Sequence, residues 1–74
     1  MGRMAQIQAS RMLRALRRLG WTLERQTGSH AVLVRPGSLP LTVPVHGGRT
    51  LKEGTARAIL KNAGITEDEF FGAY

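Results

Sequence analysis

Cysteine is absent from this 74-residue chain, which excludes disulfide bonds and thiolate zinc sites. Aromatic residues make up only 5% of the sequence, and no apolar run approaches the roughly 20 residues of a membrane-spanning helix. The first residues also lack the apolar stretch of about seven to fifteen residues that a signal peptide needs. We therefore expect a soluble, cytoplasmic protein that makes no membrane contact and is stabilised by packing alone.

Acidic residues are scarce as well. Five Asp and Glu stand against eleven Lys and Arg, which gives a formal net charge of +6 and a pI near 11.5. Four of the five acids lie from Glu53 onward, so the first half of the chain carries most of the positive charge. This charge balance is typical of small domains that bind nucleic acid, and we expect an acidic partner.

The length permits one small domain. A domain of about 60 residues buries only about 60% of the surface that its unfolded chain exposes, so the core must be compact. Neither an internal repeat nor a linker divides the sequence. We expect residues 10–74 to form the single domain and residues 1–9, which show no clear hydrophobic period, to form a flexible N-terminal arm.

A helix is predicted from Arg11 to Leu19, with Ser10 as its cap and Gly20 as its stop. At 100° per residue, its apolar and cationic side chains separate into two arcs. The apolar arc consists of Met12, Leu13, Leu16 and Leu19, and the cationic arc of Arg11, Arg14, Arg17 and Arg18. The arginines form either a solvated face or a contact surface for phosphate or a protein partner.

The hydrophobic period changes to two at Trp21, which predicts a strand with one solvated face up to Gln26. Its alternation places Trp21, Leu23 and Arg25 on one side and Thr22, Glu24 and Gln26 on the other. We expect Trp21 to belong to the core rather than to stack on nucleic-acid bases.

Two more strands follow a turn at residues 27–29. The segment from His30 to Arg35 is apolar between its ends, which indicates a central, well-covered strand. Residues 41–46 alternate between apolar and other side chains. Pro44 has no backbone donor, so the third strand is an edge strand or ends there.

Two capping boxes, in which a threonine precedes a glutamate by three residues, predict two further helices: Thr50 with Glu53, and Thr66 with Glu69. The first helix extends to about Ala63 and is followed by Gly64, which ends it. The second is a short terminal helix, Glu67–Phe71, and we expect Phe70 or Phe71 to cover the core.

This order predicts an α+β fold in which two helices cover one face of a three-stranded antiparallel sheet, with a possible short C-terminal helix. The other face of the sheet stays available. The α-β-β-β-α order is also that of the double-stranded RNA-binding domain, which reads duplex RNA largely by shape and backbone. Order alone does not establish function.

His30 is the leading candidate for chemistry, because a glycine turn delivers it to the start of a strand. Histidine suits proton transfer at neutral pH; the alternative is a turn histidine that bonds a backbone group. Gly28 is expected to supply a positive φ, and Ser29 either bonds a phosphate oxygen or satisfies the turn. Ser29 and His30 are not expected to meet, since neighbours along a strand point to opposite faces. His46 is a second acid–base group, a phosphate ligand or a loop residue.

Four segments are informative together: Gly20–Trp21, Gly28–His30, Val43–Gly47 and Gly54–Ile65. In order and spacing they resemble the HicA toxin family of bacterial toxin-antitoxin modules, over roughly residues 10 to 65. The resemblance implies a fold like the double-stranded RNA-binding domain, ribonuclease activity that cleaves mRNA and blocks translation, and inhibition by a HicB antitoxin. It also implies that His30, in the glycine-serine-histidine motif, is the catalytic histidine. Val45 stands where a basic residue is common in the family, and we expect this difference to weaken local RNA contact.

Physical chemistry agrees with this implication. Cleaving RNA without a metal requires removing a proton from the 2′-hydroxyl, protonating the leaving 5′-oxygen and stabilising charge on the phosphate. No metal-ligand spacing is present, so we expect a metal-independent endoribonuclease without a cofactor, with His30 as general acid or base. A noncatalytic RNA-binding module and a protein-interaction domain are the alternatives.

The expected partners are mRNA and a HicB-like antitoxin with an acidic contact surface, and the free protein is expected to be a monomer. Arginines close to the turn and the loop in sequence are candidates for binding the phosphates. They are Arg25, Arg35 and Arg49, with Arg14 and Arg18 of the first helix as further candidates.

Overall fold

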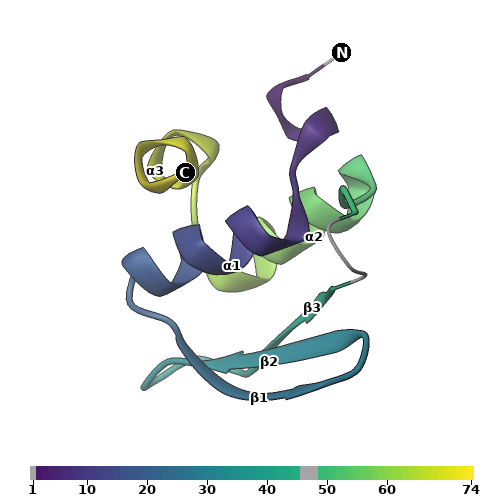
Figure 1. Cartoon of the computed structure of the whole chain (residues 1–74). Helices are drawn as coiled ribbons and strands as arrows, with labels where there is room; N and C mark the ends of the chain where they lie inside the picture. Colours follow the sequence, from purple (N-terminus) through teal and green to yellow (C-terminus); the bar gives the residue numbers. More distant parts are fainter. Residues whose placement is uncertain (1, 46–48) are drawn as a thin grey trace.

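A computed structural model describes residues 2–45 and 49–74 of the chain. Three strands form one antiparallel sheet, and the helices lie on one of its faces (Figure 1). The elements are the 3-10 helix η1 (Arg3–Gln6), α1 (Ala9–Arg18), β1 (Thr22–Thr27), β2 (His30–Val34), β3 (Leu41–Pro44), α2 (Glu53–Ala63) and α3 (Glu67–Ala73). This arrangement confirms the predicted α+β fold, including the C-terminal helix.

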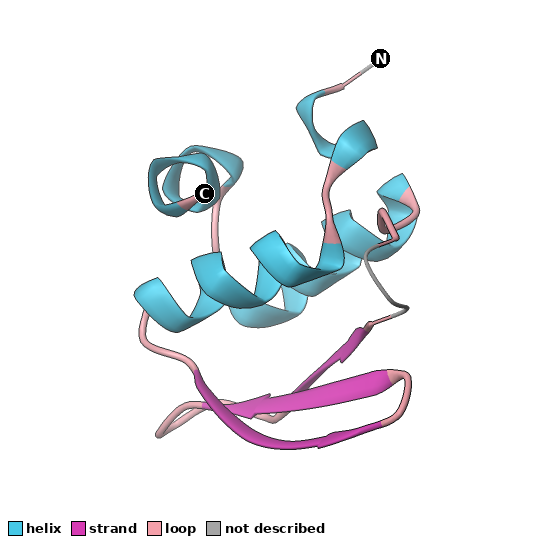
Figure 2. Ribbon diagram, viewed as in Figure 1, coloured by secondary structure: helices cyan, strands magenta, loops and turns pink. Residues whose placement is uncertain are grey.

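The sheet has the order β1-β2-β3, so β2 is central, as its apolar sequence predicts. Figure 2 shows the strands as a single layer beneath the helices. Alternate residues of β2, Ala31 and Leu33, are fully buried against the helices and pair with Val43 and Leu41 of β3. Within residues 2–45 and 49–74, no helix lies on the opposite face of the sheet (Figure 1), which confirms the prediction of an open face.

The core lies between the sheet and the helices, and the buried residues in the described part of the chain are all apolar or aromatic. Trp21 is 2% exposed, which confirms its expected place in the core. Met12 and Leu16 of the predicted apolar arc are buried, whereas Leu13 and Leu19 are only partly buried and Ala15, outside that arc, is buried instead. Helix α2 buries Ala56, Ile59, Leu60 and Ala63.

The N-terminal segment is packed, whereas we expected residues 1–9 to form a flexible arm. Met4 is fully buried and Ile7 is 2% exposed, because these two apolar side chains, three residues apart, both reach the core. Backbone bonds reinforce the contact: the Leu51 amide donates to the carbonyl of Ile7 at 2.7 Å, and the Ala9 amide donates to that of Arg49 at 3.2 Å.

Two predicted helix caps are wrong, because the N-terminal segment packs on the core and pairs with the segment before α2. Helix α1 begins at Ala9, so Ser10 lies inside the helix. Thr50 pairs with Gln8 in an isolated bridge, which keeps Thr50 outside the helix, and α2 begins only at Glu53. A long-range backbone pairing therefore replaces the local cap that the sequence predicts at Thr50.

The other helix signals are confirmed. Gly64 ends α2 in the left-handed region, with a φ of 70°. The Thr66 hydroxyl accepts from the Glu69 amide at 3.1 Å, and the Glu69 carboxylate accepts from the Thr66 amide at 2.9 Å. The bond that the carboxylate accepts from the Thr66 amide is the main cause of a lowered pKa at Glu69. Helix α3 then buries Phe70 completely.

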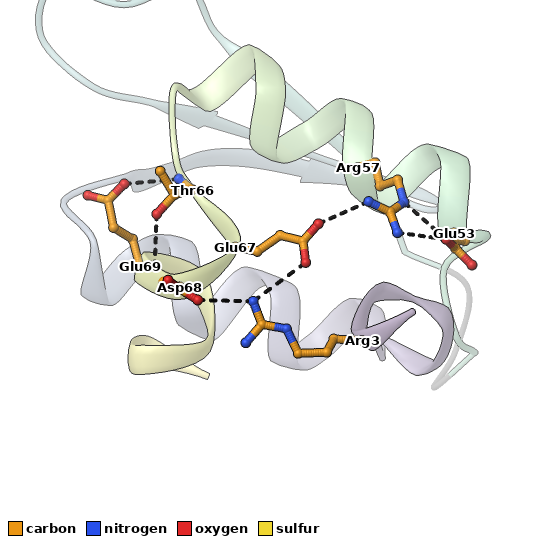
Figure 3. Close-up of polar contacts among 7 residues, drawn as sticks. All are labelled: Arg3, Glu53, Arg57, Thr66, Glu67, Asp68 and Glu69. Carbon is orange, nitrogen blue, oxygen red and sulfur yellow. Dashed lines mark hydrogen bonds and ion pairs between the residues drawn. The ribbon is translucent and has the colours of Figure 1, made fainter. Parts of the chain in front are cut away.

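An ion-pair network joins η1, α2 and α3 (Figure 3). Arg3 lies 3.1 Å from Asp68 and 3.6 Å from Glu67, and Arg57 lies 2.9 Å from both Glu53 and Glu67. The hydrogen bond to Glu53 is the main cause of a raised pKa at Arg57. These groups are exposed or only partly buried, so each ion pair contributes little to stability.

Candidate functional site

His30 is the first residue of β2 and its side chain is exposed. The turn before it contains Gly28 with a φ of 31°, which confirms the expected positive φ. Ala31 and Leu33 point into the core, and successive side chains of a strand alternate, so His30 lies on the open face with Val32. The imidazole is therefore accessible to a ligand that approaches this face.

A β-bulge brings Arg25 to the same face. The register pairs Leu23 with Leu33, and then Arg25 with Val32, so Glu24 is an extra residue in β1. Because a bulge shifts the alternation by one residue, Leu23 points to the core and Arg25 to the open face. The prediction that Leu23 and Arg25 share a face is wrong. On the open face, Arg25 lies opposite Val32, which is the next outward-facing residue of β2 after His30, so Arg25 is one row of side chains from His30.

Pro44 is the cross-strand neighbour of His30 at the free edge of β3. The Val45 amide donates to the carbonyl of Ser29 at 2.7 Å, which makes Ser29 and Val45 a hydrogen-bonded pair. The next pair, His30 and Pro44, is then a non-hydrogen-bonded pair, with Cα atoms about 4.5 Å apart. The missing amide hydrogen of Pro44 costs the sheet no bond, and β3 ends there as predicted.

The Ser29 and His30 side chains meet, contrary to the expectation that they point apart. The hydroxyl oxygen of Ser29 lies 3.2 Å from Nδ1 of His30. Strand alternation does not apply to this pair, because Ser29 belongs to the turn and the strand begins only at His30. One ring nitrogen thus has a hydroxyl partner within the protein.

A depression of about 400 Å³ lies beside this edge of the sheet. Its lining residues are Pro44, Arg49, Thr50, Leu51, Lys52 and Thr55. Two cations and two hydroxyl groups, with no acid among the lining residues, suit a phosphate group. Pro44 lines this depression and is also the cross-strand neighbour of His30, so the depression lies next to His30. Lys52 was not among the predicted phosphate-binding residues. The sequence signal for it was a cation immediately before the predicted helix.

Arg35 is not at this site, although we expected it near the turn. Its guanidinium lies 4.7 Å from the centroid of the Trp21 ring and donates to the carbonyl of Ala63 at 3.3 Å. It also contacts the Ser38 hydroxyl at 3.3 Å. At about 3.3 Å per residue, five residues of β2 separate it from His30 by about 16 Å.

The arginines of α1 form a second basic surface, because α1 covers the other face of the sheet (Figure 1). Arg14 and Arg18 help to line a depression of about 480 Å³ there, together with Ser10, Leu13 and Arg17. Arg18 also donates to the carbonyl of Ala73 at 3.1 Å. These two predicted residues are therefore not brought together with His30.

His46 lies outside the described residues, so its role stays a prediction. Within residues 2–45 and 49–74, no three His, Cys, Asp or Glu side chains are grouped so that they could hold a metal ion. In the same part of the chain, no helix is long and apolar enough to cross a membrane.

Comparison with known proteins gives two similarities. The sequence model of a family described as "HicA toxin of bacterial toxin-antitoxin" matches residues 9–65. A solved structure, "Toxin-Antitoxin complex from Streptococcus pneumoniae", contains a chain with a TM-score of 0.70 and 30% sequence identity, and the match covers 80% of this chain and 98% of that chain. Curated protein sequences include no significant match.

Proposed function

Because the chain belongs to the HicA toxin family of bacterial toxin-antitoxin modules, we propose that it is a metal-independent endoribonuclease that cleaves mRNA and blocks translation. The observation that carries this proposal is the exposed imidazole of His30 on the open sheet face, beside the cation-lined depression. Its place of action is the cytoplasm, where mRNA is translated.

His30 acts as the general acid or base of the reaction. Transesterification within RNA needs a group that removes the proton of the 2′-hydroxyl or protonates the leaving 5′-oxygen. A histidine side chain exchanges protons readily near neutral pH, and an exposed ring can reach a ribose and its phosphate together. His46, which lies outside the described residues, stays the candidate for a second acid–base group.

The phosphate backbone is held on both sides of His30. Arg25 projects from the open face one row away, and Arg49 and Lys52 line the depression beyond Pro44. An RNA strand that crosses the edge of β3 meets these cations in turn. Arginine forms bidentate contacts with phosphate oxygens and can stabilise the charge that develops in the transition state.

An antitoxin protein inhibits the toxin by direct contact. The similar solved chain is described as part of a toxin–antitoxin complex, which supports a protein partner for this chain as well. A partner with an acidic surface would complement the net charge of +6. Covering His30 or neutralising the cations around it would prevent RNA from entering.

Cleavage of RNA in excess EDTA tests the proposed activity. The wild-type protein should cleave under these conditions, and His30→Ala should cleave about 10²- to 10⁴-fold more slowly, as expected when acid–base catalysis is removed. Because His30 is exposed, the variant should keep the circular dichroism spectrum of the wild type. Equal cleavage rates in the two proteins would show that His30 is not the catalytic group.

The second candidate is a noncatalytic RNA-binding module, and the cation-lined depression favours it equally. In that case RNA would be bound but not cleaved, with an affinity that falls steeply as salt increases, because bound RNA releases counterions. The absence of RNA binding altogether would favour a third candidate, a protein-interaction domain.

A further inference from the structure

We propose that Ser29 is a positioning residue for His30: its hydroxyl group holds Nδ1 of the ring, so that Nε2 is the nitrogen that exchanges protons with RNA. This inference rests on the proposed ribonuclease activity and names how its central residue is oriented. The observation behind it is the distance of 3.2 Å between Oγ of Ser29 and Nδ1 of His30.

An exposed imidazole needs a hydrogen-bond partner if it is to keep one orientation, and Ser29 is the side-chain partner that His30 has among the described residues. None of the ion pairs among the described residues involves His30, so no carboxylate orients the ring there. Its side chain is open to solvent on a face that no helix covers. Without a bonded partner, such a ring rotates freely and its two nitrogens exchange places.

Ser29 is itself held firmly. Its carbonyl accepts from the Val45 amide at 2.7 Å, which ties the turn to the end of β3. Its side chain is partly buried, unlike that of His30. The hydroxyl is therefore attached to a backbone whose position is determined by the sheet, and it can transmit that position to the ring.

The hydroxyl group suits both protonation states of His30. In the neutral ring with its hydrogen on Nδ1, that N–H donates to Oγ and the lone pair of Nε2 is free to take a proton. In the cation, Nδ1 still donates to Oγ while Nε2 carries the proton that it can give away. The same hydrogen bond thus persists when Nε2 gains or loses its proton, and the ring need not turn between the two events.

Three substitutions test the role of Ser29 in the full chain. In Ser29→Ala, kcat for RNA cleavage should fall about 5- to 10-fold while KM stays within about twofold, since a hydrogen bond that orients a reacting group is lost. Ser29→Thr keeps the hydroxyl and should recover most of the rate. Thr42→Val is the matched control, because Thr42 presents a hydroxyl on the same face but pairs with Val32 and not with His30.

Nitrogen-15 NMR of the imidazole tests the same idea without activity. The fraction of neutral His30 with its hydrogen on Nδ1 should decrease in Ser29→Ala and should be unchanged in Thr42→Val. The signals of His30 are identified by their loss in His30→Gln.

Two results would overturn the inference: a Ser29→Ala protein that cleaves RNA at the wild-type rate, or a tautomer fraction equal to that of the wild type. If the wild-type protein does not cleave RNA, the proposed function fails instead, and the tautomer measurement alone decides whether Ser29 positions the ring.

Discussion

Replacing Phe70 with alanine should destabilise the protein by about 3–5 kcal/mol. Phe70 is fully buried, is the largest completely buried side chain in the described part of the core, and packs its ring 5.0 Å from that of Phe71 and 5.2 Å from that of Tyr74. A chain of this length has a total stability of about 4–11 kcal/mol, at 0.05–0.15 kcal/mol per residue. The predicted loss is therefore a large part of the total free energy of unfolding. Phe70 contributes this stability from outside the segment that matches the family, residues 9–65.

Thermal and urea unfolding measure this loss. At about 4–8 °C per kcal/mol for a domain of this size, Tm should fall by more than about 12 °C in Phe70→Ala. Phe71→Ala is the control, because Phe71 is only partly buried at the margin of the core, where its ring also lies 4.7 Å from the Arg3 guanidinium. That variant should lose about 1 kcal/mol. Equal losses in the two variants would show that Phe70 does not anchor helix α3 in the core.

Two further predictions concern charge. In the catalytically inactive protein, Arg49→Ala and Lys52→Ala should each lower the slope of log affinity for RNA against log salt by about 1, whereas Lys61→Ala at the other end of α2 should not; equal slopes in all three would place the phosphates elsewhere. The pKa of Glu69 is lowered from its ordinary 4.5 by the bonds from Thr66, so the charged carboxylate stabilises the folded state fully above that value and loses its effect as the pH falls through the lower, folded-state pKa. The stability difference between wild type and Glu69→Gln in urea titrations should thus be present at pH 7 and disappear in acid, and a constant difference would contradict this reasoning.

The most reliable sequence predictions were those that depend on a few consecutive residues. The capping box of Thr66 and Glu69 joins groups three residues apart, and Gly64 ends its helix through its own φ. Pro44 indicates an edge strand because a residue without a backbone donor is tolerated there, and it is the last residue of β3. The exposed His30 after a glycine turn belongs to the same class, and it remains the leading candidate for catalysis.

Predictions that depended on neighbours distant in sequence were less successful. Thr50 has the local pattern of a helix cap, yet it pairs with Gln8, which is 42 positions earlier in the sequence. The bulge at Glu24 turns Arg25 to the open face, and the two-residue period of the sequence contains no sign of it. Both outcomes depend on how separate segments pair.

The amino-acid sequence by itself determined the order of the elements, the apolar stripes of the helices and the position of His30 at the start of a strand, because these properties arise from interactions within one turn or one strand. Only the tertiary structure decided which cations lie near that histidine. Arg35, five residues away, is carried to the far end of an extended strand, whereas Arg49, nineteen positions away, lines the same depression as the cross-strand neighbour of His30. Distance in a sheet is governed by strand pairing and not by separation along the chain.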